Sequence, residues 1–258
     1  MLIASNQNKQ YKWLKSLTKK KYRERENVLL IEGRRMVQHA LEVGIKPKLI
    51  AVSEAHQDEY ADFSVDFVFK GDLFESITDT VNSQGILAVL ELSVIEQLEK
   101  PEGRHVVVCD NIQDPGNLGT IIRTCDALGI YEVYLTKGCV DPYSAKVLRS
   151  TMGSLFKVSI FKNWDAVELM NLLHEHEYHV VATALKNSVS IVDFKPEDPV
   201  AIVFGNEGNG VSEEVLDLID TAVHIPMVGS AESLNVGVAA GIALYHLNTY
   251  CAGKPTVL

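Results

Sequence analysis

The chain has 258 residues, of which 47% are hydrophobic, and a formal net charge of −10 at pH 7. This length exceeds that of a usual single domain, and the composition allows two hydrophobic cores. No stretch approaches the about 20 consecutive apolar residues of a membrane span, and the amino terminus lacks the layout of a secretory signal, so we expect a cytoplasmic protein without a membrane partner.

The amino-terminal part of the chain is basic although the whole chain is acidic. Residues 1–35 contain ten Lys and Arg side chains against three Glu. Such a segment suits a polyanion, because phosphate groups are neutralised by Lys and Arg. On charge alone, a merely solvated amphipathic helix explains it equally well. The basic residues are Lys9, Lys12, Lys15, Lys19, Lys20, Lys21, Arg23, Arg25, Arg34 and Arg35.

The first part of the chain predicts a small α/β domain, which we place at residues 1–95. A charged segment that ends in Pro-Glu-Gly follows, and we expect a linker at 96–104. Apolar patterns predict strands at 27–31, 47–52, 65–69 and 85–91, and helices at 33–43, 55–62 and 71–78.

A second domain is predicted at 105–258, where near-continuous apolar runs alternate with helical patterns. Strands without polar alternation are buried on both faces, so we expect a mainly parallel sheet covered by helices. Ligands of such sheets bind beyond the carboxyl ends of the strands. The strands are predicted at 105–110, 132–136, 155–161, 179–185, 200–205 and 222–227, and the helices at 117–129, 142–153, 164–177, 212–219 and 233–250.

The loop after the first of these strands contains the turn Asp114-Pro115-Gly116. Asn117 is a plausible cap for the following helix, and Arg123 lies six residues further along an otherwise apolar segment. A functional arginine here would clamp phosphate or ribose oxygens. A structural ion pair with Asp126 is the alternative explanation.

The loop at Gly205–Gly210 contains three glycines in six residues, which allow close approach of the backbone to a ligand or to another segment. It matches neither a Walker A loop nor the GxGxxG pattern of dinucleotide sites. A plain glycine turn is the alternative. Glu207 argues against that alternative, because a carboxylate among glycines at a strand end is better explained by a group that it holds.

The third loop, 227–235, precedes an apolar helix. Ser233 or Asn235 would cap this helix, but capping explains only one of the two. Small side chains on the helix permit close packing, either by the same chain or by a second subunit. They are Gly237, Ala239, Ala240, Gly241 and Ala243.

The three loops together predict a site that binds and orients its ligands. They contain no Ser/His/Asp set and no paired carboxylates for hydrolysis, and we expect no metal. The cysteines are scattered without a CxxC or Cys/His cluster, which fits reduced thiols, mostly buried, better than disulfides or zinc. They are Cys109, Cys125, Cys139 and Cys251.

Three segments, DNIQDPGNLGTIIRTCDALG, FGNEGNG and IPMVGSAESLNV, resemble in order and spacing the motifs of the SpoU (TrmH-like) family of RNA ribose 2′-O-methyltransferases. The resemblance covers about residues 105–250. The first part of the chain is similar to the family's L30e-like substrate-binding domain. The resemblance implies a carboxyl-terminal α/β knot of the SPOUT type, with a deep trefoil, and a homodimer formed through this knotted domain.

The resemblance also implies S-adenosylmethionine as methyl donor and RNA as substrate. It places Thr183, Gly205, Ile225 and Leu234 at the donor. The family's catalytic positions correspond to Asn117, Arg123, Glu207, Ser233 and Asn235.

The family's arginine, here Arg123, is usually assigned as the general base. A guanidinium stays protonated in proteins, so we instead expect Arg123 to bind phosphate and ribose and to stabilise the developing alkoxide. Glu207 is expected to orient Arg123, and Ser233 and Asn235 to orient the ribose or shape the loop.

Contacts with RNA are predicted for Lys19, Lys20, Lys21 and Arg23 in the basic segment. Arg149, in LRSTMGSLF, lies in another segment that resembles the family pattern and is either a phosphate contact or a surface arginine. The presence of an additional amino-terminal domain favours ribosomal over transfer RNA, by resemblance. The alternatives are a non-catalytic RNA-binding or ribosome-assembly protein of the same fold and a methyltransferase that acts on a base.

Overall fold

The computed structural model describes residues 1–80, 82–94, 101–195 and 199–251. The chain divides into two compact units, one formed by Met1–Gln97 with Tyr143–Phe156 and the other by Leu98–Pro142 with Lys157–Leu258. The predicted linker, 96–104, lies partly outside the described residues. Within the described ranges, no helix is both long and apolar enough to cross a bilayer.

The first unit contains a mixed five-stranded sheet with the order β1-β4-β3-β5-β2. Strand β5 runs antiparallel to both β2 and β3, whereas β4 runs parallel to β3 and β1. The four predicted strands are confirmed, and the two-residue strand β1 was not predicted. The strands are β1 (Leu2–Ile3), β2 (Val28–Glu32), β3 (Leu49–Ser53), β4 (Phe67–Phe69) and β5 (Ile86–Glu91).

Within the basic amino-terminal segment, residues 9–26 fold as two short helices, α1 (Lys9–Leu17) and α2 (Lys20–Glu26). Helix α1 begins where Asn8 accepts hydrogen bonds from the amides of Gln10 and Tyr11. Leu14 and Leu17 are buried in the core of the first unit, so the segment is part of the folded domain. The predicted helix at 55–62 is a 3-10 helix. The remaining helices of the unit are α3 (Arg34–Glu42), α4 (Gly71–Ile77), α6 (Ala145–Thr151) and the 3-10 helices η1 (Glu54–Tyr60), η2 (Leu92–Val94) and η3 (Ser154–Phe156).

The second unit contains a seven-stranded sheet with the order β10-β12-β9-β11-β6-β7-β8. Every neighbouring pair in it is parallel, which confirms the predicted parallel sheet. The two-residue edge strand β10 was not predicted. The strands are β6 (His105–Cys109), β7 (Glu132–Thr136), β8 (Ser159–Trp164), β9 (His179–Thr183), β10 (Val189–Ser190), β11 (Val200–Phe204) and β12 (Thr221–His224).

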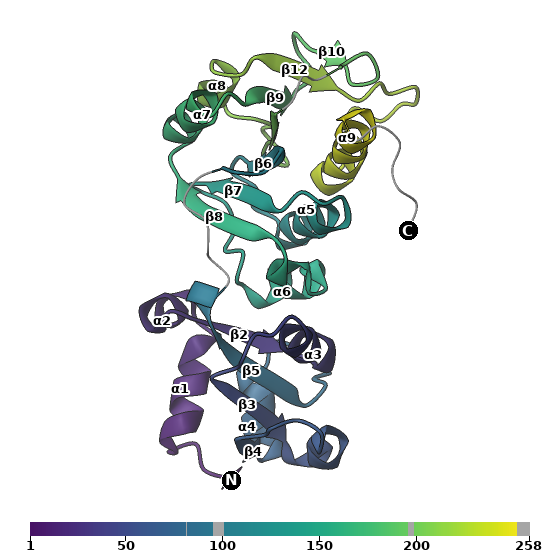
Figure 1. Ribbon diagram of the computed structural model, residues 1–258. Helices are drawn as coiled ribbons and strands as arrows, with labels where there is room; N and C mark the ends of the chain where they lie inside the picture. The colour runs from purple at the N-terminus through teal and green to yellow at the C-terminus, as the bar shows by residue number, and fades with distance from the viewer. Residues whose placement is uncertain (81, 95–100, 196–198, 252–258) are drawn as a thin grey trace. The chain divides into compact units, whose positions relative to one another are not determined.

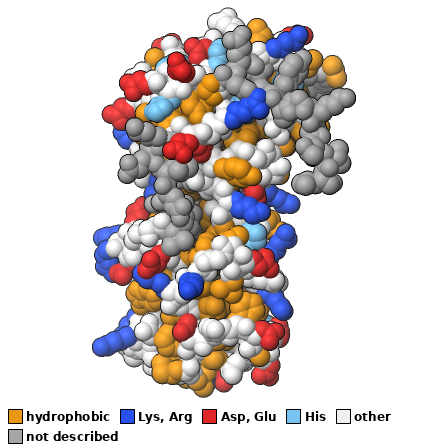
Figure 2. Space-filling model, in the orientation of Figure 1, with side chains coloured by type: hydrophobic (Ala, Val, Ile, Leu, Met, Phe, Trp, Pro, Cys, Tyr) orange, Lys and Arg blue, Asp and Glu red, His pale blue; other side chains and the backbone are white. Residues whose placement is uncertain are grey.

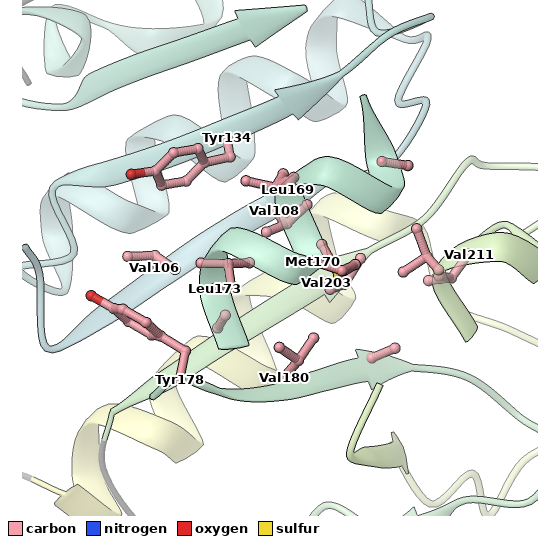
Figure 3. Close-up of a cluster of buried hydrophobic side chains, with 14 residues drawn as sticks. Val106, Val108, Tyr134, Leu169, Met170, Leu173, Tyr178, Val180, Val203 and Val211 are labelled. Atoms are coloured by element: carbon pink, nitrogen blue, oxygen red, sulfur yellow. The ribbon is translucent and has the colours of Figure 1, made fainter. Parts of the chain in front are cut away.

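Helices cover both faces of this parallel sheet (Figure 1). Helices α7 (Ala166–Glu175) and α8 (Glu213–Leu216) lie on one face, and α5 (Pro115–Ala127) and α9 (Val236–Cys251) lie side by side on the other. Figure 3 shows how side chains of α7 meet those of the central strands, with Leu169, Met170 and Leu173 against Val106 and Val108. Each fully buried aliphatic side chain of this kind contributes about 1.5–3 kcal/mol. The continuous apolar character of the strands follows from this burial on both sides.

Candidate functional site

The loops that follow β6 and β11 lie at the same edge of the sheet, because the two strands are parallel neighbours and Cys109 pairs with Phe204. Two buried or partly buried side chains join the loops. Asp110 accepts hydrogen bonds from the Thr136 hydroxyl (3.0 Å) and from the Ser212 amide (2.8 Å). The Asn206 side-chain amide donates to the Asn111 carbonyl at 2.9 Å. The glycine-rich loop is therefore fixed against the loop that precedes α5.

The glycine-rich loop is a tight turn that requires glycine at its first position. Asn206 and Gly210 exchange two backbone hydrogen bonds of 2.9 Å, and Gly210 has a φ of 73°. A Cβ atom on Gly205 would lie 2.1 Å from the carbonyl carbon of Gly210 and from the amide nitrogen of Val211, both in the backbone. Any larger residue at position 205 would therefore displace the turn that presents Glu207.

Glu207 reaches from this turn to the start of α5. Its carboxylate accepts hydrogen bonds from the backbone amides of Gln113 (3.2 Å) and Asp114 (3.0 Å) and from the side-chain amide of Asn117 (2.9 Å). Burial raises the pKa of Glu207, but these hydrogen bonds to the ionised form outweigh it and leave the pKa below its usual value. Glu207 is therefore a carboxylate at neutral pH.

Asp114, and not Asn117, caps helix α5. The Asp114 carboxylate accepts the amide of Asn117 at 2.9 Å, and Pro115 occupies the first helical position, where its missing N–H costs nothing. The predicted cap was therefore wrong, and the helix begins two residues earlier than predicted. This leaves the side chain of Asn117, which is 8% exposed, available for other contacts.

Asn117 connects all three loops. Its side-chain nitrogen donates to Glu207, and its side-chain oxygen accepts a 2.8 Å hydrogen bond from the side-chain amide of Asn235. The oxygen of Asn235 in turn accepts the amides of Gly237 (2.9 Å) and Val238 (3.3 Å) and so caps α9. The sequence left the cap of this helix open between Ser233 and Asn235, and in the structure Asn235 forms it. Ser233 lies exposed two residues earlier.

Arg123 lies on the exposed side of α5, about two turns after its start. It has no hydrogen bond or ion pair with any residue in the described parts of the chain, so the alternative pairing with Asp126 does not form. Glu207 accepts hydrogen bonds from Asn117 and two backbone amides, and it forms no hydrogen bond or ion pair with Arg123. The expected orientation of Arg123 by Glu207 is not seen.

The family model of the SpoU rRNA methylases matches residues 104–245, which contain all three loops. The chain belongs to the SpoU rRNA methylase family. A model of the MRM3-like substrate-binding domain matches residues 8–88. The predicted family, and a substrate-binding domain in the first part of the chain, are confirmed.

Characterised relatives of this SpoU methylase match it over most of its length. The 23S rRNA (guanosine(2553)-2′-O)-methyltransferase RlmP of Bacillus subtilis is 35% identical over 247 residues, which are 95% of this chain and 98% of the relative. The human mitochondrial rRNA methyltransferase 3 is 31% identical, over 90% of this chain and 70% of the relative.

Solved structures of the family share the fold. The AdoMet-bound rRNA methyltransferase from Sinorhizobium meliloti has a TM-score of 0.84 and 30% identity, over 97% of this chain and 98% of that chain. The SpoU methyltransferase AviRb from Streptomyces viridochromogenes, in complex with AdoMet, has a TM-score of 0.84 and 25% identity, over 96% of this chain and 100% of that chain. These similarities confirm the predicted α/β fold class.

The four residues predicted at the methyl donor lie at or after the carboxyl ends of three adjacent strands of this SpoU methylase. Thr183 ends β9 and donates a 3.2 Å hydrogen bond to the Val203 carbonyl, and Gly205 follows β11. Ile225 follows β12 and, like Leu234 further along the same loop, is partly buried. Because β12, β9 and β11 are parallel neighbours, their carboxyl ends meet at one edge of the sheet.

The predicted RNA contacts differ in exposure. Lys19, Lys20 and Lys21 are exposed, whereas Arg23 is 8% exposed and donates to the carbonyls of Leu17 (3.0 Å) and Thr18 (3.2 Å) at the end of α1. Arg23 therefore supports the fold, and its prediction as a phosphate contact is corrected. On the face shown in Figure 2, Lys and Arg side chains are scattered and do not form one patch.

Sequence reasoning missed Asp110, Asp114 and Asn206, which hold the loops together. The Asp-Pro pair at 114–115 was a usable signal, because Asp favours the cap and Pro the first helical position. The roles of Asp110 and Asn206 depend on contacts with distant residues. Among the described residues, no group of three His, Cys, Asp or Glu side chains is placed to bind a metal, and Cys109 and Cys125 are buried free thiols.

Proposed function

We propose that this SpoU methylase transfers a methyl group from S-adenosylmethionine to a ribose 2′-hydroxyl in structured RNA, and in ribosomal RNA in particular. The observation that carries the proposal is the chain of hydrogen bonds Glu207–Asn117–Asn235, which joins the three motif loops at one edge of the parallel sheet. The relatives named for rRNA methylation and the AdoMet-bound structures of the same fold support it.

The residues at this edge fit the methyl donor. Gly205 keeps the backbone open at the end of β11, and the partly buried Ile225 and Leu234 supply apolar contacts of the kind that an adenosine requires. Thr183 completes the proposed set. Bound S-adenosylmethionine supplies an electrophilic methyl group, so the protein mainly has to hold the ribose oxygen in line with it, at about 3 Å.

Arg123 is the residue proposed to act on the substrate. Its exposed guanidinium, without a partner among the described residues, is suited to bind the phosphate and ribose and to stabilise the alkoxide as the hydroxyl loses its proton. Asn117 and Glu207 position the start of the same helix, and Ser233 and Asn235 shape the loop beside it. All five retain their proposed place in the catalytic site.

A homodimer that forms through the second unit is part of the proposal. Helix α9 exposes Val238, Ile242 and Tyr245, which are 50%, 41% and 60% exposed and whose spacing places them on one side of the helix. An apolar stripe of this kind suits a subunit interface.

We also propose the trefoil knot. Helix α9 packs on α5, which follows β6 in the chain. Strand β12, which precedes α9, is separated from β6 in the sheet by β9 and β11.

The proposed division of the chain remains 1–95, 96–104 and 105–258, and the two family matches at 8–88 and 104–245 support it. We propose that the exposed Lys19, Lys20 and Lys21 of the first domain bind RNA phosphates, and that Arg149, from the 105–258 part of the chain, does so as well. The bacterial rRNA methyltransferase relative supports a place in the cytoplasm.

The proposal is tested by mass spectrometry of nucleosides from the RNA of cells with and without the protein. We expect one 2′-O-methylnucleoside to disappear, to return with the wild-type protein and to stay absent with Arg123→Ala. A methylated base in its place would identify a base methyltransferase. An unchanged nucleoside profile, with RNA binding retained, would identify a non-catalytic RNA-binding protein.

The role of the lysines is tested by reversing their charges together, as Lys19→Glu, Lys20→Glu and Lys21→Glu. Loss of three phosphate contacts reduces the slope of log K against log salt by about 2 to 3 and lowers RNA affinity, while the affinity for S-adenosylmethionine stays the same. Unchanged RNA affinity would remove these lysines from the interface.

A further inference from the structure

The first unit contains a cavity of about 310 Å³, bordered by the start of α3, the segment before β5 and helix α6. This volume lies in the range of about 300–1,000 Å³ that is usual for ligand pockets. We propose that it binds one unpaired nucleotide of the RNA substrate, an inference that rests on the proposed function. The residues that carry the argument are Arg35, Met36, Asn82, Gln84, Arg149 and Met152.

Arg149 supplies a fixed cationic side chain at the wall of the cavity. One of its terminal nitrogens, Nη2, pairs with Asp79 at 3.0 Å, which fixes the guanidinium. The other, Nη1, is buried, and no described residue accepts a hydrogen bond from it. A cation fixed in this way favours an anionic group on a ligand, such as phosphate. Arg35, also at the cavity, is exposed and has no ion pair within the described ranges.

The amide side chains at the cavity have donors to spare, and the carboxylate of Glu32, which also lines the cavity, is engaged with neighbouring groups. Both oxygens of Glu32 are engaged, by the Thr80 hydroxyl and by the Asp79 amide. The Gln84 oxygen accepts the Arg34 amide at 2.8 Å, which orients the side chain and leaves its NH₂ group without a described partner.

Asn82 has no hydrogen bond with a described residue. The cavity therefore presents donors from two amides and two arginines, a set that matches phosphate oxygens and the acceptor atoms of a base.

Two methionines supply the apolar part of the cavity wall. Met36 is buried in α3, and Met152 follows α6 with 40% of its surface exposed. Thioether side chains adapt to flat aromatic rings and contact them favourably. Sequence-dependent recognition of RNA commonly takes an unpaired base out of the strand, contacts its face and hydrogen-bonds its edge. A nucleotide is the ligand that uses the cationic, amide and apolar groups of this cavity together.

The test measures the affinity of the full-length protein for a 23S rRNA transcript. Arg35→Gln and Asn82→Ala change exposed side chains, so the fold is retained. Lys48→Gln is the control, because Lys48 is an exposed cationic residue of the same unit that pairs with Glu91, lies outside the basic amino-terminal segment and does not line the cavity. We expect Kd to rise about tenfold for Arg35→Gln, about fivefold for Asn82→Ala and at most about twofold for the control.

Single abasic positions in the unpaired regions of the transcript complete the test. One position should weaken binding to the wild type, and combining it with Asn82→Ala should add no further loss, because both remove the same contact. The proposal is overturned if the effects of Asn82→Ala and of the abasic substitution add fully at every abasic position. It is also overturned if the cavity variants bind RNA like the control. Binding of guanosine 5′-monophosphate that depends on Asn82, with RNA affinity unchanged, would assign the cavity to a free nucleotide and also overturn it.

Methylation of the transcript by the wild type is measured in parallel. Absence of 2′-O-methylation together with RNA binding that depends on Arg35 and Asn82 would contradict the proposed function and support the nucleotide cavity. Normal methylation together with cavity variants that bind RNA like the control would support the proposed function and contradict the nucleotide cavity.

Discussion

Replacement of Glu207 by glutamine tests whether its carboxylate positions the start of α5. The carboxylate accepts three hydrogen bonds, from two backbone amides and from Asn117. Glutamine keeps the length of the side chain but replaces one acceptor oxygen with a donor NH₂ group, so at least one of these three N–H groups loses its partner. Asn117, and through it Asn235, would then be held less firmly.

The expected loss follows from the type of bond. A hydrogen bond to a charged group contributes about 1.5–3 kcal/mol, and the exposure of Glu207 reduces this to about 1–2 kcal/mol. If this free energy is lost from the stabilisation of the transition state, kcat falls about 5- to 30-fold. The affinity for S-adenosylmethionine should change little, because Glu207 holds α5 and is not among the residues proposed at the donor.

The assay is methyl transfer from labelled S-adenosylmethionine to a 23S rRNA transcript, with the donor Kd from calorimetry and the thermal midpoint of each variant. Glu175→Gln is the matched control, because Glu175 is exposed on α7 and forms no bond with a described residue. A Glu207→Gln protein with kcat within twofold of the control would refute the positioning role.

The pH dependence of this contribution has a definite sign. The pKa of Glu207 is lowered in the folded protein, because hydrogen bonds to the ionised carboxylate outweigh the effect of burial. Its contribution is therefore complete above the usual carboxylate pKa and is lost only as pH falls through the lowered value. Glu207→Gln should accordingly show the same fold-loss of kcat at every pH from about 6 to 8. A loss that disappears towards pH 6 would indicate a raised pKa and contradict the assignment.

Substitutions at two further positions, Gly205 and Asn235, separate loop geometry from function. Gly205→Ala places a methyl group against the backbone of residues 210 and 211, and should destabilise the protein by about 1–3 kcal/mol and abolish donor binding. The control Gly208→Ala, whose Cβ meets nothing closer than 3.6 Å, should melt like the wild type, and equal melting temperatures for both variants would contradict the turn geometry. Asn235→Ala removes the α9 cap and should cost about 1 kcal/mol of stability. Asn235→Asp keeps the cap but not the donation to Asn117, so it should lower kcat with little change in melting temperature; an unchanged kcat would exclude the contact from catalysis.

The parallel sheet could be predicted because the amino-acid composition of each strand reflects its burial. Segments such as HVVVC and VAIVF are apolar at every position, which only burial on both faces explains. The place of the candidate site followed from the same pattern, since polar and glycine-rich loops come directly after these strands. These loops and the helices that follow them contain Asn117, Arg123, Glu207, Ser233 and Asn235, and the family motifs then assigned these residues to the catalytic site.

The contacts between these residues could not be predicted, because each depends on which distant group comes within hydrogen-bonding distance. Asn117 is a reasonable helix cap by its position, yet Asp114 takes that role and frees Asn117 to join Glu207 and Asn235. Arg23 is one of ten basic residues in its segment, and only the packing of α1 and α2 shows that its guanidinium is used within the fold.

The sequence by itself determined the α/β class, the parallel sheet of the second unit and the family, because periodicity, loop composition and motif spacing are local properties of the chain. Tertiary structure decided that Tyr143–Phe156 groups with the first unit, that three loops meet at Asn117 and that a cavity forms beside Arg149. These features join residues 70 to 118 positions apart, and no local pattern specifies which of many possible partners a side chain meets.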